Sequence, residues 1–115
     1  MQNQRGNING PNGQSGSLQF RTVTGDYTIT ELDAGAVVEV DSPDPVVITL
    51  EATAPASGFY CEVVRVGAGT VQFAAGTGAT VLSSAGATPS IAAQQEGATI
   101  TKREAGAWRV QGAIA

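Results

Sequence analysis

Residues 67–83, with the sequence GAGTVQFAAGTGATVLS, constrain the fold of this chain more than any other segment. Val71 and Phe73 alternate with small or polar residues, and this period of two is typical of a half-buried β-strand. Glycines on both sides, at positions 67, 69, 76 and 78, suit the unusual backbone angles of tight β-connections. The segment therefore predicts a β-scaffold, and it contains no group able to carry out a reaction.

Similar strand-like runs recur along the rest of the chain, separated by turn signals. The predicted strands cover residues 18–23, 27–30, 36–40, 46–50, 59–66, 70–75, 79–83, 90–94, 98–103 and 108–114. Residues 30–35 predict one helical turn, with Thr30 as its cap, Asp33 three residues later and Gly35 at its end. Because short strands at this spacing favour a sandwich or barrel, we expect an all-β fold: a compact antiparallel β-sandwich or barrel-like domain over residues 17–115.

Composition is compatible with association of this domain with copies of itself. A chain of 115 residues forms at most one domain. Apolar residues make up 42% of it, but many are alanines, and aromatic residues make up only 5%. Because alanine buries little surface, the core is thin, and a thin core gains stability by burying more surface against sister subunits.

The residue types present disfavour catalysis and cofactor binding. The chain has no histidine, the commonest general base and metal ligand. Cys61 is the only cysteine and lies in the apolar run FYCEVVRV, so we expect a buried, inert thiol and no disulfide. Zinc would require several further Cys or His ligands. We therefore expect no enzyme activity, metal or cofactor.

Three polar motifs have a structural and a functional interpretation. Asp41 and Asp44 flank a Ser-Pro pair, which favours a turn over a calcium site. Glu31 and Asp33 point apart at this spacing, so helix capping explains Asp33 better than paired acid catalysis. The glycine pairs of residues 67–69 and 76–78 precede strands and not a helix, which favours turns over a phosphate loop.

Charge and hydropathy argue against two classes of partner. The net charge is −4, and the six basic residues are scattered, so nucleic acid is not an expected partner. No apolar run approaches the ~20 residues that span a bilayer. The first ten residues, MQNQRGNING, lack the apolar core of a secretory signal.

The aromatic residues allow two interpretations. Tyr27, Tyr60 and Trp108 could stack on a sugar ring, but aromatic residues spread over separate strands favour a core or an interface. The predicted packing residues, in the core or between subunits, are Phe59, Tyr60, Val71, Phe73 and Trp108.

Several motifs together resemble those of a known family. They are YTIT at residues 27–30, DAG at 33–35, VVITL at 46–50, GF at 58–59, VV at 63–64, GAG at 67–69, VQFAAG at 71–76, and Trp108 in the last strand. This pattern is similar to a β-domain widespread in virion proteins of tailed bacteriophages, at the ends of head and tail fibres and in capsid-attached proteins. The resemblance implies a trimeric, non-enzymatic structural protein, synthesised in the cytoplasm of the host bacterium and assembled into the virion.

The segment before the domain helps to choose among the roles that the resemblance allows. Residues 1–16 are rich in Asn, Gln and Gly and should be disordered in isolation. They form either a terminus without function or an arm that becomes ordered across a neighbouring molecule.

With no long shaft, repeat or coiled coil ahead of the domain, we expect a capsid decoration (cement) protein on the outer surface of the head. Its partners would be the major capsid protein and two further copies of itself. The residues expected to grip the capsid are Gln4, Arg5, Asn7, Ile8 and Asn9. The alternative is a receptor- or carbohydrate-binding tip domain of a head or tail fibre.

Overall fold

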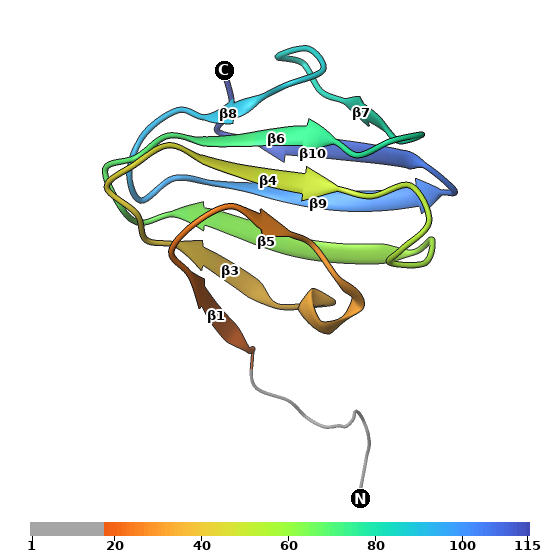
Figure 1. The fold of residues 1–115 in the computed structure, drawn as a ribbon, viewed down its shortest axis with the longest axis horizontal. Coiled ribbons are helices and arrows are strands. Elements are labelled where there is room, and N and C mark those ends of the chain that lie inside the picture. The colour runs from red at the N-terminus through yellow and green to blue at the C-terminus, as the bar shows by residue number, and fades with distance from the viewer. Residues whose placement is uncertain (1–17) are drawn as a thin grey trace, which may run out of the picture.

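Alternating apolar and polar residues form ten strands in the computed structural model, which describes residues 18–115. The strands are β1 (Phe20–Val23), β2 (Tyr27–Thr28), β3 (Val37–Val40), β4 (Val46–Leu50), β5 (Phe59–Arg65), β6 (Val71–Ala75), β7 (Thr80–Leu82), β8 (Ser90–Ile91), β9 (Gly97–Glu104) and β10 (Ala107–Gly112). A single 3₁₀ turn, η1 (Glu31–Asp33), precedes β3. The strands form a six-stranded sheet, β1-β3-β5-β9-β10-β7, and a four-stranded sheet, β2-β4-β6-β8, which overlap face to face (Figure 1).

The first six strands are wound as successive turns of one coil. After each strand the chain crosses to the other sheet, so the next strand of the same sheet runs in the same direction. One turn takes the chain from Phe20 to its partner Val37, and the next takes it from Val37 to Glu62. The winding places β1 and β2 at one end of the stack, whereas the C-terminus lies at the other end (Figure 1).

The expected all-β sandwich is confirmed, but its strands are not uniformly antiparallel. Antiparallel pairing holds for β5 with β9, β9 with β10, and β6 with β8. The other neighbouring strands pair in parallel, including β10 with β7. The reason is the winding: a connection through the opposite sheet returns the chain in its original direction, whereas a hairpin reverses it.

Two of the glycines singled out in the sequence have a different role from the one expected. Gly67 and Gly69 do not have positive φ angles. A Cβ on Gly67 would overlap the backbone of Ser42, and a Cβ on Gly69 would overlap the backbone of Asp44. The amide of Gly69 donates to the carbonyl of Ser42 (2.8 Å). These glycines therefore allow two successive turns of the coil to stack in close contact, and only Gly78 of this set has the predicted left-handed backbone (φ 81°).

The core lies between the two sheets and is built from alternate residues of each strand. In β4, which was predicted as a strand over residues 46–50, the buried residues are Val46, Ile48 and Leu50. Their counterparts in the six-stranded sheet include Val38, Cys61 and Ile100. Burial of these side chains is the main favourable contribution to folding, at roughly 25 cal/mol per Å² of apolar surface.

Candidate functional site

Four of the five predicted packing residues lie in the core. Phe59, Val71, Phe73 and Trp108 are buried, and the rings of Phe59 and Trp108 pack edge to face with centroids 5.6 Å apart. Tyr60 is different, because 46% of its surface is exposed on the outer side of the six-stranded sheet. Tyr60 is therefore available for a contact outside the chain.

A buried lysine lies beside Trp108. The Nζ of Lys102 donates to the carbonyl oxygens of Ala52 and Pro55 (both 2.7 Å) and of Glu51 (3.3 Å), and it lies 5.4 Å from the centre of the Trp108 ring. The indole nitrogen of Trp108 donates to the same Glu51 carbonyl (2.8 Å). These contacts fasten the loop between β4 and β5 to the core. Lys102 lies two residues after Ile100 and four after Ala98 in β9, so the alternation of the strand places all three side chains on the buried face. This alternation is the sequence feature from which the burial of Lys102 could have been predicted.

A second polar cluster surrounds Asp33, which is fully buried. Its carboxylate accepts hydrogen bonds from the amide of Thr30 and the hydroxyl of Tyr27 (each 2.9 Å) and pairs with the Arg21 Nε at 2.8 Å. Thr30 and Asp33 form the predicted capping box. Burial, followed by the hydrogen bond to Asp33, raises the pKa of Tyr27, while a hydrogen bond with Tyr27 and the charge of Asp33 raise the pKa of Arg21. The cluster joins β1 and β2 to η1.

The remaining motifs also have structural roles. Cys61 is buried as predicted, and burial raises the pKa of its thiol to about 12. Asp44 belongs to a turn in which the Ser42 hydroxyl accepts from its amide (3.1 Å) and donates to its carbonyl (3.0 Å). Among residues 18–115, no group of three or more Cys, Asp or Glu side chains is placed to hold a metal ion.

Exposed apolar side chains gather on the outer face of the six-stranded sheet near its β1 edge. Leu18 and Phe20 are each 63% exposed, and strand periodicity places both on one face. Phe20 pairs with Val37, and Val37 pairs in turn with Glu62. Tyr60 lies in the adjacent row, because the amide of Gly35 donates to its carbonyl, and the Tyr60 hydroxyl donates to the Glu62 carboxylate (3.2 Å). Leu18, Phe20, Val37 and Tyr60 therefore form one surface, the apolar outer patch.

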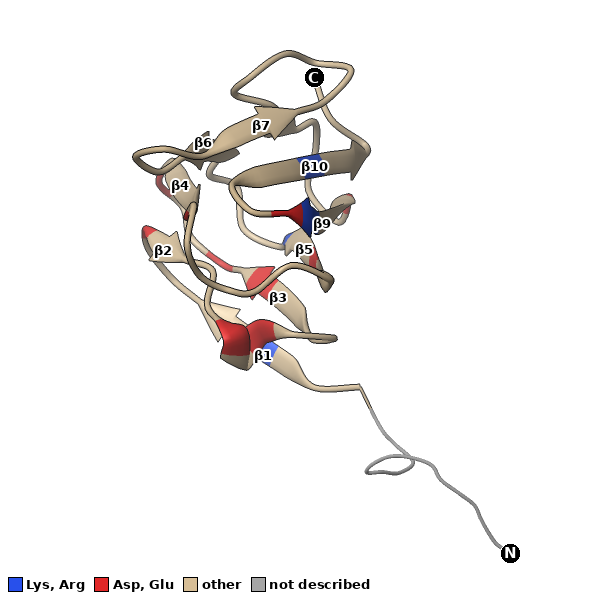
Figure 2. Ribbon diagram, turned by 90° about the vertical axis from the view of Figure 1, so that its right-hand side faces the viewer, with Lys and Arg blue, Asp and Glu red and all other residues tan. Residues whose placement is uncertain are grey.

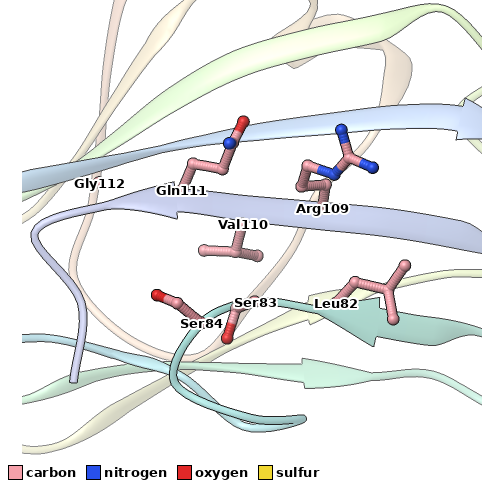
Figure 3. A pocket seen from close by; sticks show the side chains of 7 residues that line it. All are labelled: Leu82, Ser83, Ser84, Arg109, Val110, Gln111 and Gly112. Atoms are coloured by element: carbon pink, nitrogen blue, oxygen red, sulfur yellow. The ribbon is translucent and has the colours of Figure 1, made fainter.

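A groove lies at the opposite edge of the same sheet, between β10 and the segment after β7. It has a volume of about 450 Å³. Its lining residues are Leu82, Ser83, Ser84, Arg109, Val110, Gln111 and Gly112 (Figure 3). A smaller hollow of about 180 Å³ shares Leu82 and Arg109 with it and extends to Arg103. The sequence did not predict this site, because β7 and β10 are distant in sequence and become neighbours only through their parallel pairing in the folded sheet.

The residues predicted to grip a capsid lie outside the described part of the chain. Gln4, Arg5, Asn7, Ile8 and Asn9 all precede residue 18. Among residues 18–115, no helix is long and apolar enough to cross a membrane. Comparison of the whole chain with known proteins finds no matching family model, and no curated protein or solved structure is significantly similar to it.

Proposed function

We propose that this chain is a capsid decoration protein, which trimerises and binds the outer surface of a bacteriophage head. It acts by binding and does not catalyse a reaction. Each trimer bridges neighbouring copies of the major capsid protein, so its binding free energy stabilises the assembled shell. Three attachment points per trimer raise the overall affinity well above that of a single contact.

The observation that carries this proposal is the apolar outer patch. A small β-domain normally protects an edge strand and keeps large apolar groups off its surface. Here Phe20 stands exposed on the edge strand β1 and Leu18 stands exposed just before it, with Tyr60 on the same face. We assign this patch to the contact between subunits, which is one of the two positions, core or subunit interface, expected for Tyr60 from the sequence.

The role of gripping the capsid is assigned to residues 1–16. Their polar composition suits an arm that gains backbone hydrogen bonds from a neighbouring molecule. The two roles are separable, since the patch lies on the folded domain and the arm precedes it.

Self-association is tested by light scattering coupled to size-exclusion chromatography. The intact chain should elute as a trimer, and Phe20→Ser should weaken association about 10-fold or more, because burying a Phe side chain contributes roughly 1.5–3 kcal/mol. Leu32→Ser is the matched control: Leu32 is 73% exposed but lies on η1, outside the patch. A monomeric intact chain would refute the trimer, and equal effects of the two substitutions would refute the assignment of the patch.

Capsid binding is tested on purified virions and on capsids stripped of this protein. Many copies should be present per particle, and adding the protein back should raise the temperature at which stripped capsids rupture. Deleting residues 1–16 should abolish binding and leave the trimer intact. A few copies at a single location would instead identify a fibre or tail tip and overturn the proposal.

A further inference from the structure

The groove beside β10 exists because a strand pairing stops early. β7 pairs with β10 from Thr80 to Leu82, opposite Ala107 to Arg109, and its chain then turns away. β10 continues to Gly112 without a strand of the described chain on that side. In Figure 3, the segment of Ser83 and Ser84 lies across the groove from β10.

The open edge of β10 presents backbone groups to this groove. Successive residues of a strand direct their amide and carbonyl groups to opposite sides. The Gly106 carbonyl accepts from Thr80 on the β7 side (2.7 Å), whereas the Ala113 amide donates to Gly97 on the β9 side (3.1 Å). By this alternation the backbone groups of Val110 and Gly112 face the groove. The Gly112 carbonyl already accepts from Ile114 (2.9 Å), which leaves the Val110 carbonyl and the Gly112 amide for a partner.

The opposite wall of the groove is held in place by its own hydrogen bonds. The Ser83 hydroxyl donates to the Gly86 carbonyl (2.6 Å) and accepts from the Ala85 amide (3.0 Å). Gly86 adopts a left-handed backbone (φ 94°) that closes this loop. The groove is therefore formed before a ligand arrives, which lowers the entropic cost of binding.

The charge of the groove is positive in an acidic protein. Three of the five basic residues in the described part have internal partners: Arg21 pairs with Asp33, and Arg65 and Lys102 donate to backbone carbonyls. Arg103 and Arg109 make no side-chain hydrogen bond or ion pair within residues 18–115. Arg109 is the charged residue that lines the groove, and it also lines the smaller hollow together with Arg103 and Glu104. Figure 2 shows basic residues on β9 and β10, with an acidic residue beside the basic one on β9, and further acidic residues around η1, β2 and β3.

We propose that this groove docks an extended, acidic peptide segment of a partner protein, which adds to the six-stranded sheet beside β10. The backbone of the segment pairs with Val110 and Gly112, and its carboxylates bind Arg109 and Arg103. Leu82 provides an apolar contact at the closed end. The open strand edge favours a peptide over an anionic saccharide, which has no regularly spaced amides to pair with it. This inference does not depend on capsid binding, since the test uses the isolated chain.

The test measures fluorescence anisotropy of a labelled peptide with the sequence VEVEVEVE. The peptide should bind in low salt, and Arg109→Gln should weaken binding about 10- to 100-fold, the effect of losing a hydrogen bond to a charged group. Gln19→Glu is the matched control: it makes the same change in net charge at an exposed position next to β1, at the opposite edge of the sheet, and should leave affinity unchanged. Circular dichroism verifies that both variants fold.

A second probe separates backbone pairing from charge attraction alone. The same peptide with alternate amides N-methylated keeps its carboxylates but loses one row of hydrogen-bond donors, so its affinity should fall at least about 10-fold. Equal binding of the two peptides would overturn strand addition. Tighter binding of oligogalacturonate than of the peptide would show a saccharide site, and no binding of either probe would refute a docking groove.

Discussion

Replacement of Lys102 by methionine tests whether three hydrogen bonds outweigh the cost of burying an ammonium group. Lys102 is only 1% exposed, and no ion pair involves it within residues 18–115. Methionine retains the apolar stem but leaves the carbonyls of Ala52 and Pro55 without their donor. Each unsatisfied buried carbonyl costs about 1–3 kcal/mol. Because relief of the desolvation penalty offsets part of this cost, we expect a net loss of about 3 kcal/mol.

Urea unfolding, followed by circular dichroism and by the fluorescence of the single tryptophan, measures this loss. With an m-value of about 1.5 kcal/mol/M for a domain of this size, the midpoint should fall by about 2 M. Arg103→Met is the matched control, because the adjacent Arg103 is exposed and its replacement should change stability by less than about 0.5 kcal/mol. A Lys102→Met variant as stable as the parent would show that desolvation outweighs the hydrogen bonds and would refute the reasoning.

Two further predictions concern close packing and pH. Gly69→Ala should lower the free energy of unfolding by about 1–3 kcal/mol, because its Cβ would overlap Asp44, whereas Gly25→Ala should be nearly neutral, because a Cβ there meets no atom within 4 Å; urea midpoints compare the two. The Cys61 thiol has a pKa of about 12 in the folded chain and about 8.5 when unfolded. Its contribution to stability is therefore complete below pH ~8.5 and falls above it by up to ~1.4 kcal/mol per pH unit. Unfolding at pH 8 and pH 10.5 should show a smaller decline for Cys61→Ala than for the parent, and parallel declines would contradict this.

The sequence predicted the strands well because burial on one face leaves a period of two. Val46–Leu50 was predicted at its observed bounds, and the capping box of Thr30 and Asp33 was correctly identified. Both features are local, since they depend on residues within one strand or one turn. Strand direction is not local: the same alternation occurs in parallel and antiparallel sheets, so the winding of β1 to β6 left no distinguishing pattern.

Features of the candidate site that depend on distant residues were not predictable in the same way. Gly69 is required by the backbone of Asp44, which the preceding turn of the coil places against it. Lys102 is buried because three carbonyls of the loop after β4 surround its Nζ. The groove requires β7 and β10 to pair and then diverge. Each of these arises from a contact between segments that are separate in sequence.

Because the first six strands follow a coiled path, the number of strands in each sheet could be changed by adding or removing whole turns of the coil. Each turn of the coil contributes one strand to each sheet. Each strand pairs with the strands of the turns before and after it, as β3 does where Val37 lies between Phe20 and Glu62. Insertion of a complete coil would therefore lengthen the protein by one strand spacing, ~4.8 Å, and leave the neighbouring side chains in register. A series of proteins with increasingly wide sheets can be designed by duplicating one turn of the coil, with the hairpin of β9 and β10 left unchanged at the end of the chain.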